Sequence, residues 1–310
     1  MQIRADEFYS DARYMSYCSI GTEVIRMPLT IAPLPTPECD FSEWSINKND
    51  RAKLVEIIAY LYLRQEENAL RVIRALDPTR RVSKGNVVHN VLRKLTAPRA
   101  ADVELYRHGT DKEKKAAKSR MQTSVLHRDG LLFQHVSWIA ARIAVPNGYM
   151  TAPHVRQADK GFDGFIVELD SDGEEIARIV LCEDKASKSP RGLITSSVWT
   201  DIEAILRGER DDEILADLVT LLKSMPGIDA ETAVDEVFWE GVREFRVAVA
   251  TGENQRKDGD FKHIIAGFEA VAGGSKSSRS AGVLAFDEVR KGLALLAGEV
   301  AAKVEEISNV

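Results

Sequence analysis

Asp163 and Glu183 are two carboxylates at the outer ends of neighbouring apolar segments. The segments GFIVEL (164–169) and IARIVLC (176–182) are rich in β-branched residues, and the DSDG run between them has typical turn chemistry. Asp163 lies nine residues before Asp172, and Glu183 lies ten residues after Gly173. A hairpin that turns at Asp172-Gly173 therefore places the two carboxylates opposite each other, with their Cβ atoms ~5 Å apart if they share a face.

Two carboxylates at one end of a sheet repel each other unless a cation lies between them. Mg²⁺ and Mn²⁺ are hard cations that accept carboxylate, carbonyl and water oxygens, so either ion relieves the conflict. Side chains two residues apart on a strand point the same way. Lys185 is therefore expected on the side of Glu183, and the side chain of Asp184 on the other. A lysine in that position can orient or deprotonate an attacking water, or stabilise a pentacovalent phosphate.

The segment KGFDGFIVELDSDGEEIARIVLCEDK resembles the core of the PD-(D/E)xK nuclease superfamily, which has the restriction-endonuclease-like fold. Asp163 matches the first aspartate of the motif, and Glu183-Asp184-Lys185 matches ExK. The resemblance covers about residues 131–206. It implies an α/β fold with a mixed central sheet flanked by helices, and a metal ion held by Asp163, Glu183 and the carbonyl of Asp184, with Lys185 assisting.

The same family often draws an auxiliary residue from the helix before the hairpin. That helix is expected over Leu131 to Val145, and it carries Gln134 and His135. The resemblance implies that one of them reaches the site, with His135 slightly favoured as a metal ligand. Each residue also has a structural reading: His135 as a core histidine on a mostly apolar helix, and Asp163 as the cap of a turn after Gly161.

Positive charge is concentrated between Pro78 and Arg128, where 13 basic residues face 4 acidic ones although the chain as a whole carries −6. The basic residues are Arg80, Arg81, Lys84, Arg93, Lys94, Arg99, Arg107, Lys112, Lys114, Lys115, Lys118, Arg120 and Arg128. This asymmetry is expected where one surface meets phosphate. Lys112, Lys114, Lys115 and Lys118 are the predicted phosphate contacts, and a solvated helical face is the alternative.

Two further cations, Lys188 and Arg191, follow the ExK triplet directly. They are placed to hold phosphates that flank the reacting one, and an ordinary basic loop is the equally weighted alternative.

The periodicity of apolar residues predicts the surrounding elements. Helices are expected within Asn49–Leu76 and Val87–Leu95, an extended arm over the proline-rich 27–40, and a strand at Phe245–Ala250. Further helices are expected at 198–206, 213–222, 261–271 and 287–307, and the GGSKSSRS run as a flexible loop. The predicted organisation is a mainly helical region, 1–125, that binds nucleic acid or a partner, followed by a nuclease domain, 126–310.

Composition and absent motifs exclude several classes of protein. Hydrophobic residues make up 44% and charged residues 29%, which is typical of a folded globular chain, and the three cysteines have neither disulfide nor zinc spacing. The sequence contains no GxGxxG, GxxxxGK[ST], HExxH or GxSxG motif, so any ATP-driven movement along nucleic acid requires a separate helicase or translocase. An acidic start and the lack of a long apolar window predict a cytoplasmic protein without a membrane segment.

Together the residues predict a metal-dependent nuclease that hydrolyses phosphodiester bonds, with DNA favoured over RNA and Mg²⁺ or Mn²⁺ as cofactor. A role in bacterial antiviral defence or restriction is an analogy at the level of the fold. Two alternatives remain open: a non-catalytic nucleic-acid-binding or complex-forming subunit that keeps the fold, and a structural protein in which Asp163 caps a turn.

Overall fold

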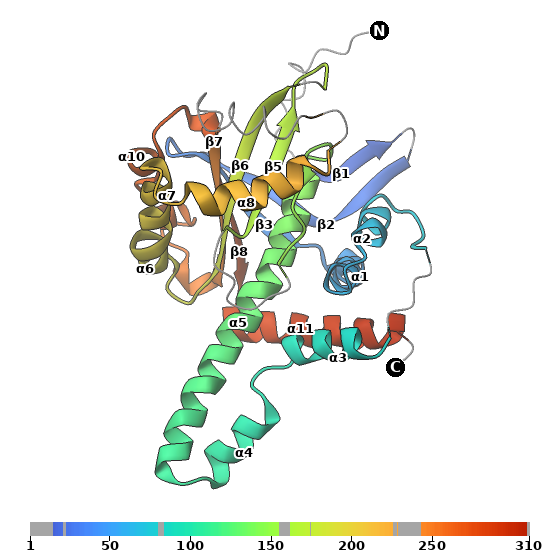
Figure 1. Ribbon diagram of the computed structural model, residues 1–310, viewed down its shortest axis with the longest axis vertical. Coiled ribbons are helices and arrows are strands. Elements are labelled where there is room, and N and C mark those ends of the chain that lie inside the picture. The colour runs from blue at the N-terminus through green and yellow to red at the C-terminus, as the bar shows by residue number, and fades with distance from the viewer. Residues whose placement is uncertain are drawn as a thin grey trace.

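A computed structural model describes residues 15–20, 23–79, 84–154, 162–173, 175–225, 228 and 243–308. One mixed sheet of eight strands runs through this part of the chain in the order β1-β2-β3-β8-β7-β6-β5-β4 (Figure 1). The strands are β1 (Met15–Ile20), β2 (Glu23–Leu34), β3 (Asp40–Ile46), β4 (Tyr149–Met150), β5 (Gly164–Leu169), β6 (Ile176–Ala186), β7 (Arg243–Gly252) and β8 (Arg279–Phe286). The chain is therefore a mixed α/β protein.

The four central strands, β3, β8, β7 and β6, run parallel to one another, and the outer pairs are antiparallel. Parallel strands need helices on both faces, because the crossover connections place them there. The run FRVAVA in β7 is accordingly apolar on both faces except at Arg246, and the residues of β7 from Phe245 to Gly252 are buried.

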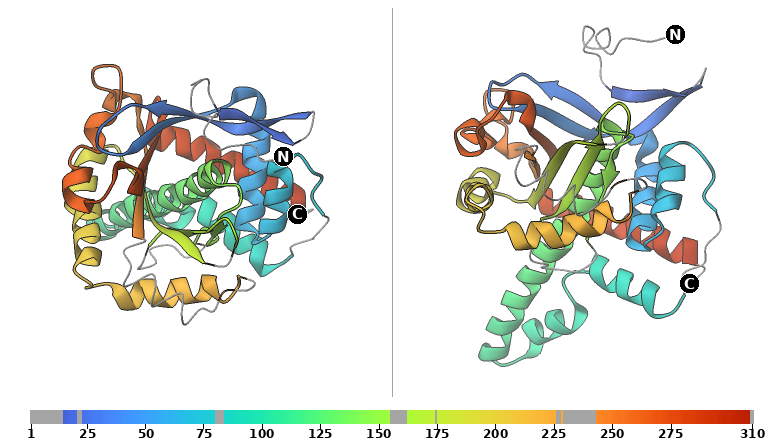
Figure 2. Two further views of the ribbon diagram at one scale, coloured as in Figure 1. Left: turned by 90° about the horizontal axis from the view of Figure 1, so that it is seen from above. Right: turned by 45° about the horizontal axis from the view of Figure 1, so that its top comes forward.

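The helices are α1 (Arg51–Tyr62), α2 (Glu66–Ile73), α3 (Asn86–Leu95), α4 (Ala100–His108), α5 (Asp111–Ala144), α6 (Pro190–Leu193), α7 (Trp199–Leu206), α8 (Asp211–Leu222), α10 (Phe268–Ala272) and α11 (Val289–Ser308). One apolar core lies between the sheet and α1, α2, α3, α5 and α11. A second lies on the other face, under α7, α8 and α10. Figure 2 shows the two helical layers on either side of the strands.

Helix α5 is a single helix of 34 residues with two different halves. A capping box between Thr110 and Glu113 begins it, and Pro146 follows shortly after its end at Ala144. The second half, from Arg128 onward, is almost entirely buried, whereas most residues of the first half are exposed. The first half and α4 pack as a hairpin that projects from the body of the molecule (Figure 1).

The predicted N-terminal region needs two corrections. It was expected to be mainly helical with an extended arm, but β1, β2 and β3 come from it and belong to the same sheet as the rest of the chain. The predicted boundary between residues 125 and 126 falls inside α5. The prolines mislead because Pro33 lies in β2 beyond Ile31, the last residue that pairs with β1, so its missing N–H removes no bond to that neighbour.

The other predictions of helices and strands depart from the structure mainly in the last third of the chain. The two hairpin strands, β7, α3, α7, α8 and α11 lie where they were expected. The helix expected at 261–271 is reduced to a 3-10 turn at Lys262–Ile264 and the short α10. The GGSKSSRS run contains a 3-10 turn and the start of β8, a strand that the loop composition concealed. Among the helices that the structure describes, none has the length and apolar character that a membrane crossing requires.

Candidate active site

The hairpin of β5 and β6 has the register that its turn predicts. Gly164 pairs with Cys182, and the pairs continue in step to Glu168 and Arg178 before a bulge next to the turn. One residue further out, the N–H of Asp163 donates to the carbonyl of Cys182 at 3.1 Å. Asp163 is therefore opposite Glu183 at the open end of the hairpin.

The side chains of Asp163, Glu183 and Lys185 meet at this end of the sheet. The ammonium Nζ of Lys185 lies 2.5 Å from Oε2 of Glu183 and 3.9 Å from Oδ2 of Asp163. Oδ2 of Asp163 also accepts a hydrogen bond of 2.7 Å from the main-chain N–H of Asp184. The three residues singled out by the sequence thus form one cluster.

This cluster holds two carboxyl groups in a place where water screens their charges poorly. The side chains of Asp163 and Glu183 are 14% and 5% exposed. Burial, and then the proximity of Asp163, raises the pKa of Glu183 to about 7, and burial raises that of Asp163 to about 6. Although burial opposes its charge, Lys185 has a raised pKa because Glu183 and Asp163 surround it. The site therefore favours positive charge beyond what one lysine supplies.

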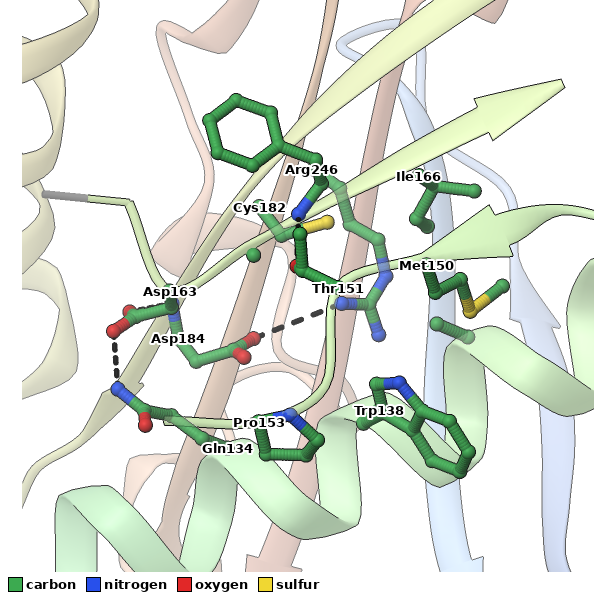
Figure 3. Close-up of a pocket in the computed structure, with 13 residues that line it drawn as sticks. Gln134, Trp138, Met150, Thr151, Pro153, Asp163, Ile166, Cys182, Asp184 and Arg246 are labelled. Carbon is green, nitrogen blue, oxygen red and sulfur yellow. Dashed lines mark hydrogen bonds and ion pairs between the residues drawn. The ribbon is translucent and has the colours of Figure 1, made fainter. Parts of the chain in front are cut away.

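Asp184 points to the opposite face of β6, as the alternation of a strand requires. Its Oδ1 accepts a hydrogen bond of 2.5 Å from the hydroxyl of Ser137 on α5, and it lies 3.7 Å from the guanidinium of Arg246 on β7. Arg246 also donates to the hydroxyl of Ser137 at 2.8 Å and to its carbonyl at 3.1 Å. Figure 3 shows the pair of Asp184 and Arg246 beside the pocket that Asp163 borders. The side chain of Asp184 thus connects β6 to α5 and β7. Only the main-chain carbonyl of Asp184 is left for the predicted metal.

Arg246 and Ser137 were not identified as site residues from the sequence. Both are buried, at 9% and 0% exposure. A usable signal existed in β7, where Arg246 is the one charge inside the run FRVAVA. A charge in a strand buried on both faces needs a partner, and Asp184 on the neighbouring strand supplies it.

On α5, the helix before the hairpin, Gln134 contacts Asp163 and His135 does not. The amide Nε2 of Gln134 donates to Oδ1 of Asp163 (Figure 3), while its Oε1 is buried without a hydrogen-bond partner among the described residues. His135 is fully buried, stacks on Tyr62 with ring centroids 4.0 Å apart, and hydrogen-bonds the carbonyl of Leu131 at 2.7 Å. Adjacent helical residues diverge by about 100°. The expectation that His135 reaches the acidic pair is therefore wrong, and Gln134 is the residue of this helix that contacts Asp163.

Because His135 is buried, we expect the free energy of unfolding to depend on pH. Burial lowers its pKa from 6.5 to about 3. Protons therefore bind preferentially to the unfolded chain, and stability is lost as the pH falls below 6.5 toward 3, by about 1.4 kcal/mol per pH unit. His135→Phe, which keeps the stack on Tyr62, should abolish this contribution of about 2 kcal/mol at pH 5.

Urea unfolding at several pH values measures the slope. His89→Phe, a change of the same kind at an exposed position on α3, serves as the control and should keep the wild-type slope. An equal slope in His135→Phe would show that the ring is not held neutral.

The basic residues between Pro78 and Arg128 fall into different environments, and the four lysines predicted to contact phosphate differ from the arginines. Lys112, Lys114, Lys115 and Lys118 lie on the projecting half of α5, and among the described residues none of them pairs with a carboxylate. Arg128 is 4% exposed and pairs with Asp129 at 2.6 Å, so it is a buried structural residue. Arg120 and Arg107 pair with Asp102 and Glu104. Arg80 and Arg81 lie outside the described residues.

The two cations after the ExK triplet already have partners. Lys188 pairs with Glu288 at 3.0 Å but stays 63% exposed. Arg191 donates to the carbonyls of Ala266 and Ile264 at 2.5 and 3.3 Å. Arg191 therefore anchors a neighbouring loop, whereas Lys188 keeps an exposed ammonium.

The donor set at the hairpin end fits a hard divalent cation only with help from the main chain and water. Within the described residues, no group of three or more His, Cys, Asp or Glu side chains is arranged to hold a metal ion. Asp163 and Glu183 supply two carboxylates, and Mg²⁺ commonly takes one or two carboxylates and keeps several waters. The chemistry of the donors is therefore compatible with Mg²⁺ or Mn²⁺, and the ion pair of Lys185 with Glu183 marks where positive charge is favoured.

Comparison with known proteins gives no relative: no family model, no curated protein and no solved structure matches this chain.

Proposed function

We propose that the chain is a metal-dependent nuclease that hydrolyses phosphodiester bonds, with DNA as the favoured substrate. The observation that carries this proposal is the cluster of Asp163, Glu183 and Lys185 at the open end of one hairpin, with Gln134 bound to Asp163. Two poorly screened carboxylates beside a lysine are an unfavourable arrangement for stability alone, which is typical of a site selected for chemistry.

The order of elements around the cluster supports a restriction-endonuclease-like core. Helix α5 precedes the hairpin, and a helical crossover returns the chain to β7, which runs parallel to β6. This arrangement is compatible with the fold that the motif resembles. The role in antiviral defence and the association with a separate translocase remain hypotheses drawn from that resemblance.

Each residue of the cluster has a defined task in this proposal. Asp163 and Glu183, with the carbonyl of Asp184, would hold Mg²⁺ or Mn²⁺, which polarises a phosphodiester and activates water. Lys185 brings a permanent positive charge next to the phosphate oxygens that become more negative during the reaction. Gln134 fixes the rotamer of Asp163 by donating to one carboxylate oxygen, while the N–H of Asp184 holds the other.

Cleavage assays on plasmid, linear duplex, single-stranded DNA and RNA test the proposal in Mg²⁺, Mn²⁺ and EDTA. Cleavage should require the metal. Divalent metal should also raise Tm by linkage, and Glu183→Ala should remove that shift. Absence of cleavage on all four substrates would overturn the proposal.

A non-catalytic nucleic-acid-binding subunit is the second candidate, because Glu183 and Lys185 already neutralise each other at 2.5 Å. Binding to nucleic acid without any metal-dependent cleavage would favour it.

The projecting lysines give a separate expected result. Lys112 and Lys118 lie about 33 and 24 Å along α5 from Gln134, at 1.5 Å per residue. Substituting glutamine for Lys112, Lys114, Lys115 and Lys118 together should weaken duplex binding uniformly across sequences. It should also flatten the log–log salt slope by up to about 3.6, at about 0.9 per phosphate contact. Single-turnover cleavage of saturated substrate should stay near the wild-type rate, because the cluster is untouched.

Filter binding or fluorescence anisotropy across salt concentrations measures the slope. An unchanged affinity and slope would assign these lysines to a solvated face or to a protein partner.

A further inference from the structure

Phe162, the residue before Asp163, is anchored at the open end of the hairpin. The N–H of Asp163 bonds the carbonyl of Cys182 at 3.1 Å, but β5 begins only at the next residue. The side chain of Phe162 is buried, and its ring centroid lies 5.9 Å from that of Phe165 on β5. The position of this ring therefore determines where the main chain enters Asp163.

Arg210, which lies between α7 and α8, covers the ring of Phe162. Its guanidinium carbon Cζ is 4.9 Å from the centroid of the ring, within the distance at which an aromatic face attracts a cation. Its Nη1 also lies 3.3 Å from Oδ1 of Asp201, in the first turn of α7. The side chain of Arg210 is 17% exposed. Arg210 thus connects Phe162 to the start of α7.

These contacts lie on the face of the sheet that carries Glu183. Ile179 and Leu181 precede Glu183 on β6 by four and two residues, and both belong to the apolar core under α7, α8 and α10. Because side chains two residues apart on a strand share a face, Glu183 points to the same side. Phe162 is part of the same core. Arg210 therefore approaches the candidate site from the face on which Glu183 lies.

We propose that Arg210 is a positioning residue of the candidate active site, which holds Phe162 in place and so sets where the carboxylate of Asp163 lies. This inference rests on the proposed function and adds a residue that acts from outside the cluster. The carboxylate of Asp163 accepts from Gln134 and from the N–H of Asp184 only if its main chain is correctly placed. A misplacement of about 1 Å in an active site can lower the rate about 100-fold.

The chain contains a second pair of the same kind, away from the hairpin. The Cζ of Arg256 lies 4.3 Å from the ring centroid of Phe261, and its guanidinium pairs with Glu43 on β3 at 2.6 Å. In the sheet, β8 and β7 separate β3 from β6. Arg256→Met is therefore the matched control for Arg210→Met, because each change takes a cation away from a buried ring and from a carboxylate.

The hydrogen bond from Asp184 to Asp163 provides a signal that does not depend on activity. A main-chain N–H that donates to a carboxylate makes a strong bond, which shifts its proton resonance downfield and slows its exchange with water. In Arg210→Met, the N–H resonance of Asp184 should move upfield and its exchange should become about 10-fold faster or more. Arg256→Met should leave both unchanged. NMR spectra of isotope-labelled protein measure the two quantities.

Cleavage kinetics provide a second measurement. The kcat of Arg210→Met should fall about 10- to 100-fold while KM changes little, because Arg210 acts through the position of Asp163. Arg210→Lys, which keeps a cation for Phe162 and Asp201, should recover part of the rate. A residue that only supports the fold would lower Tm and leave the kcat of the folded protein intact, and Arg256→Met should behave in this way.

The NMR signal separates this inference from the proposed nuclease. A changed Asp184 signal in Arg210→Met, but not in Arg256→Met, supports the inference even if no protein cleaves and the nuclease proposal fails. An unchanged signal, or an equal change in both variants, overturns the inference, and cleavage by the wild type would then leave the nuclease standing. A changed signal with wild-type kcat in an active protein would also overturn it, because the position of Asp163 would not affect the reaction.

Phe162→Leu tests the same contact if Arg210→Met does not fold. Leucine keeps an apolar side chain in the core but has no aromatic face for Arg210. The variant should show the same change in the Asp184 signal as expected for Arg210→Met. An unchanged signal in Phe162→Leu would overturn the inference.

Discussion

Replacing Glu183 with glutamine is expected to lower the single-turnover rate of DNA cleavage by about 100- to 1,000-fold, the typical cost of removing one preorganised charged group. The change removes a charge that, in the proposed site, would help to hold the cation, and it leaves the shape of the side chain intact. Glu183 is 4% exposed and its carboxylate is repelled by Asp163. The variant should therefore fold at least as well as the wild type in the absence of metal.

Lys185→Met should lower the rate by a similar factor but with the opposite effect on stability. The ammonium of Lys185 is the nearest positive charge to both carboxylates, at 2.5 and 3.9 Å. Without it, Asp163 and Glu183 face each other unshielded at neutral pH, and Tm should fall. If both variants lose activity but only Lys185→Met loses Tm, the loss of activity is not caused by unfolding.

Glu168→Gln is the matched control on the same hairpin. Glu168 pairs with Arg178 near the turn, away from the open end that carries the cluster. It should cleave at the wild-type rate. Wild-type cleavage by Glu183→Gln or Lys185→Met in Mg²⁺ would show that the hydrolytic site lies elsewhere.

Local sequence signals sufficed for the hairpin and for most helices. The DSDG turn and two apolar runs determine the register of β5 and β6. Counting residues outward from that turn then predicts that Asp163, just before β5, lies opposite Glu183 on β6. The same reasoning places Asp184 on the opposite face, because strands alternate. This part of the site depends on contacts close in sequence.

The rest depends on contacts between distant segments, which periodicity does not report. Strand β8 pairs in parallel with β3, more than 200 residues earlier, and its Gly282 leaves the space that the indole of Trp44 fills. A Cβ at Gly282 would lie 2.0 Å from that ring, so the glycine is a packing requirement and not a sign of a flexible loop. Likewise, the choice between Gln134 and His135 depends on the rotation of α5 against the sheet, which the sequence of the helix alone leaves open.

Asp129 is the residue whose loss should cost the fold most among the charged groups near the site. It is fully buried on α5, and its two oxygens accept from Arg128 at 2.6 Å and from Arg290 on α11 at 2.7 Å. Arg290 also donates to the carbonyl of Ala186, the residue after Lys185, at 3.2 Å. One carboxylate thus joins α5 and α11 to the end of the strand that carries the candidate site.

Asp129→Ala is expected to destabilise the protein by about 3–5 kcal/mol, because it leaves two arginines without their partner and one of them buried. For a chain of this size the Tm should fall by roughly 6–15 °C. Asp102→Ala removes a comparable aspartate–arginine pair between α4 and α5, but its Arg120 is 51% exposed, so the expected loss is below about 1 kcal/mol. Thermal and urea unfolding of both variants measure the difference. Equal stability of Asp129→Ala and Asp102→Ala would mean that water reaches Arg128 and Arg290 when Asp129 is removed, and that the buried network does not hold α11 against the strand end.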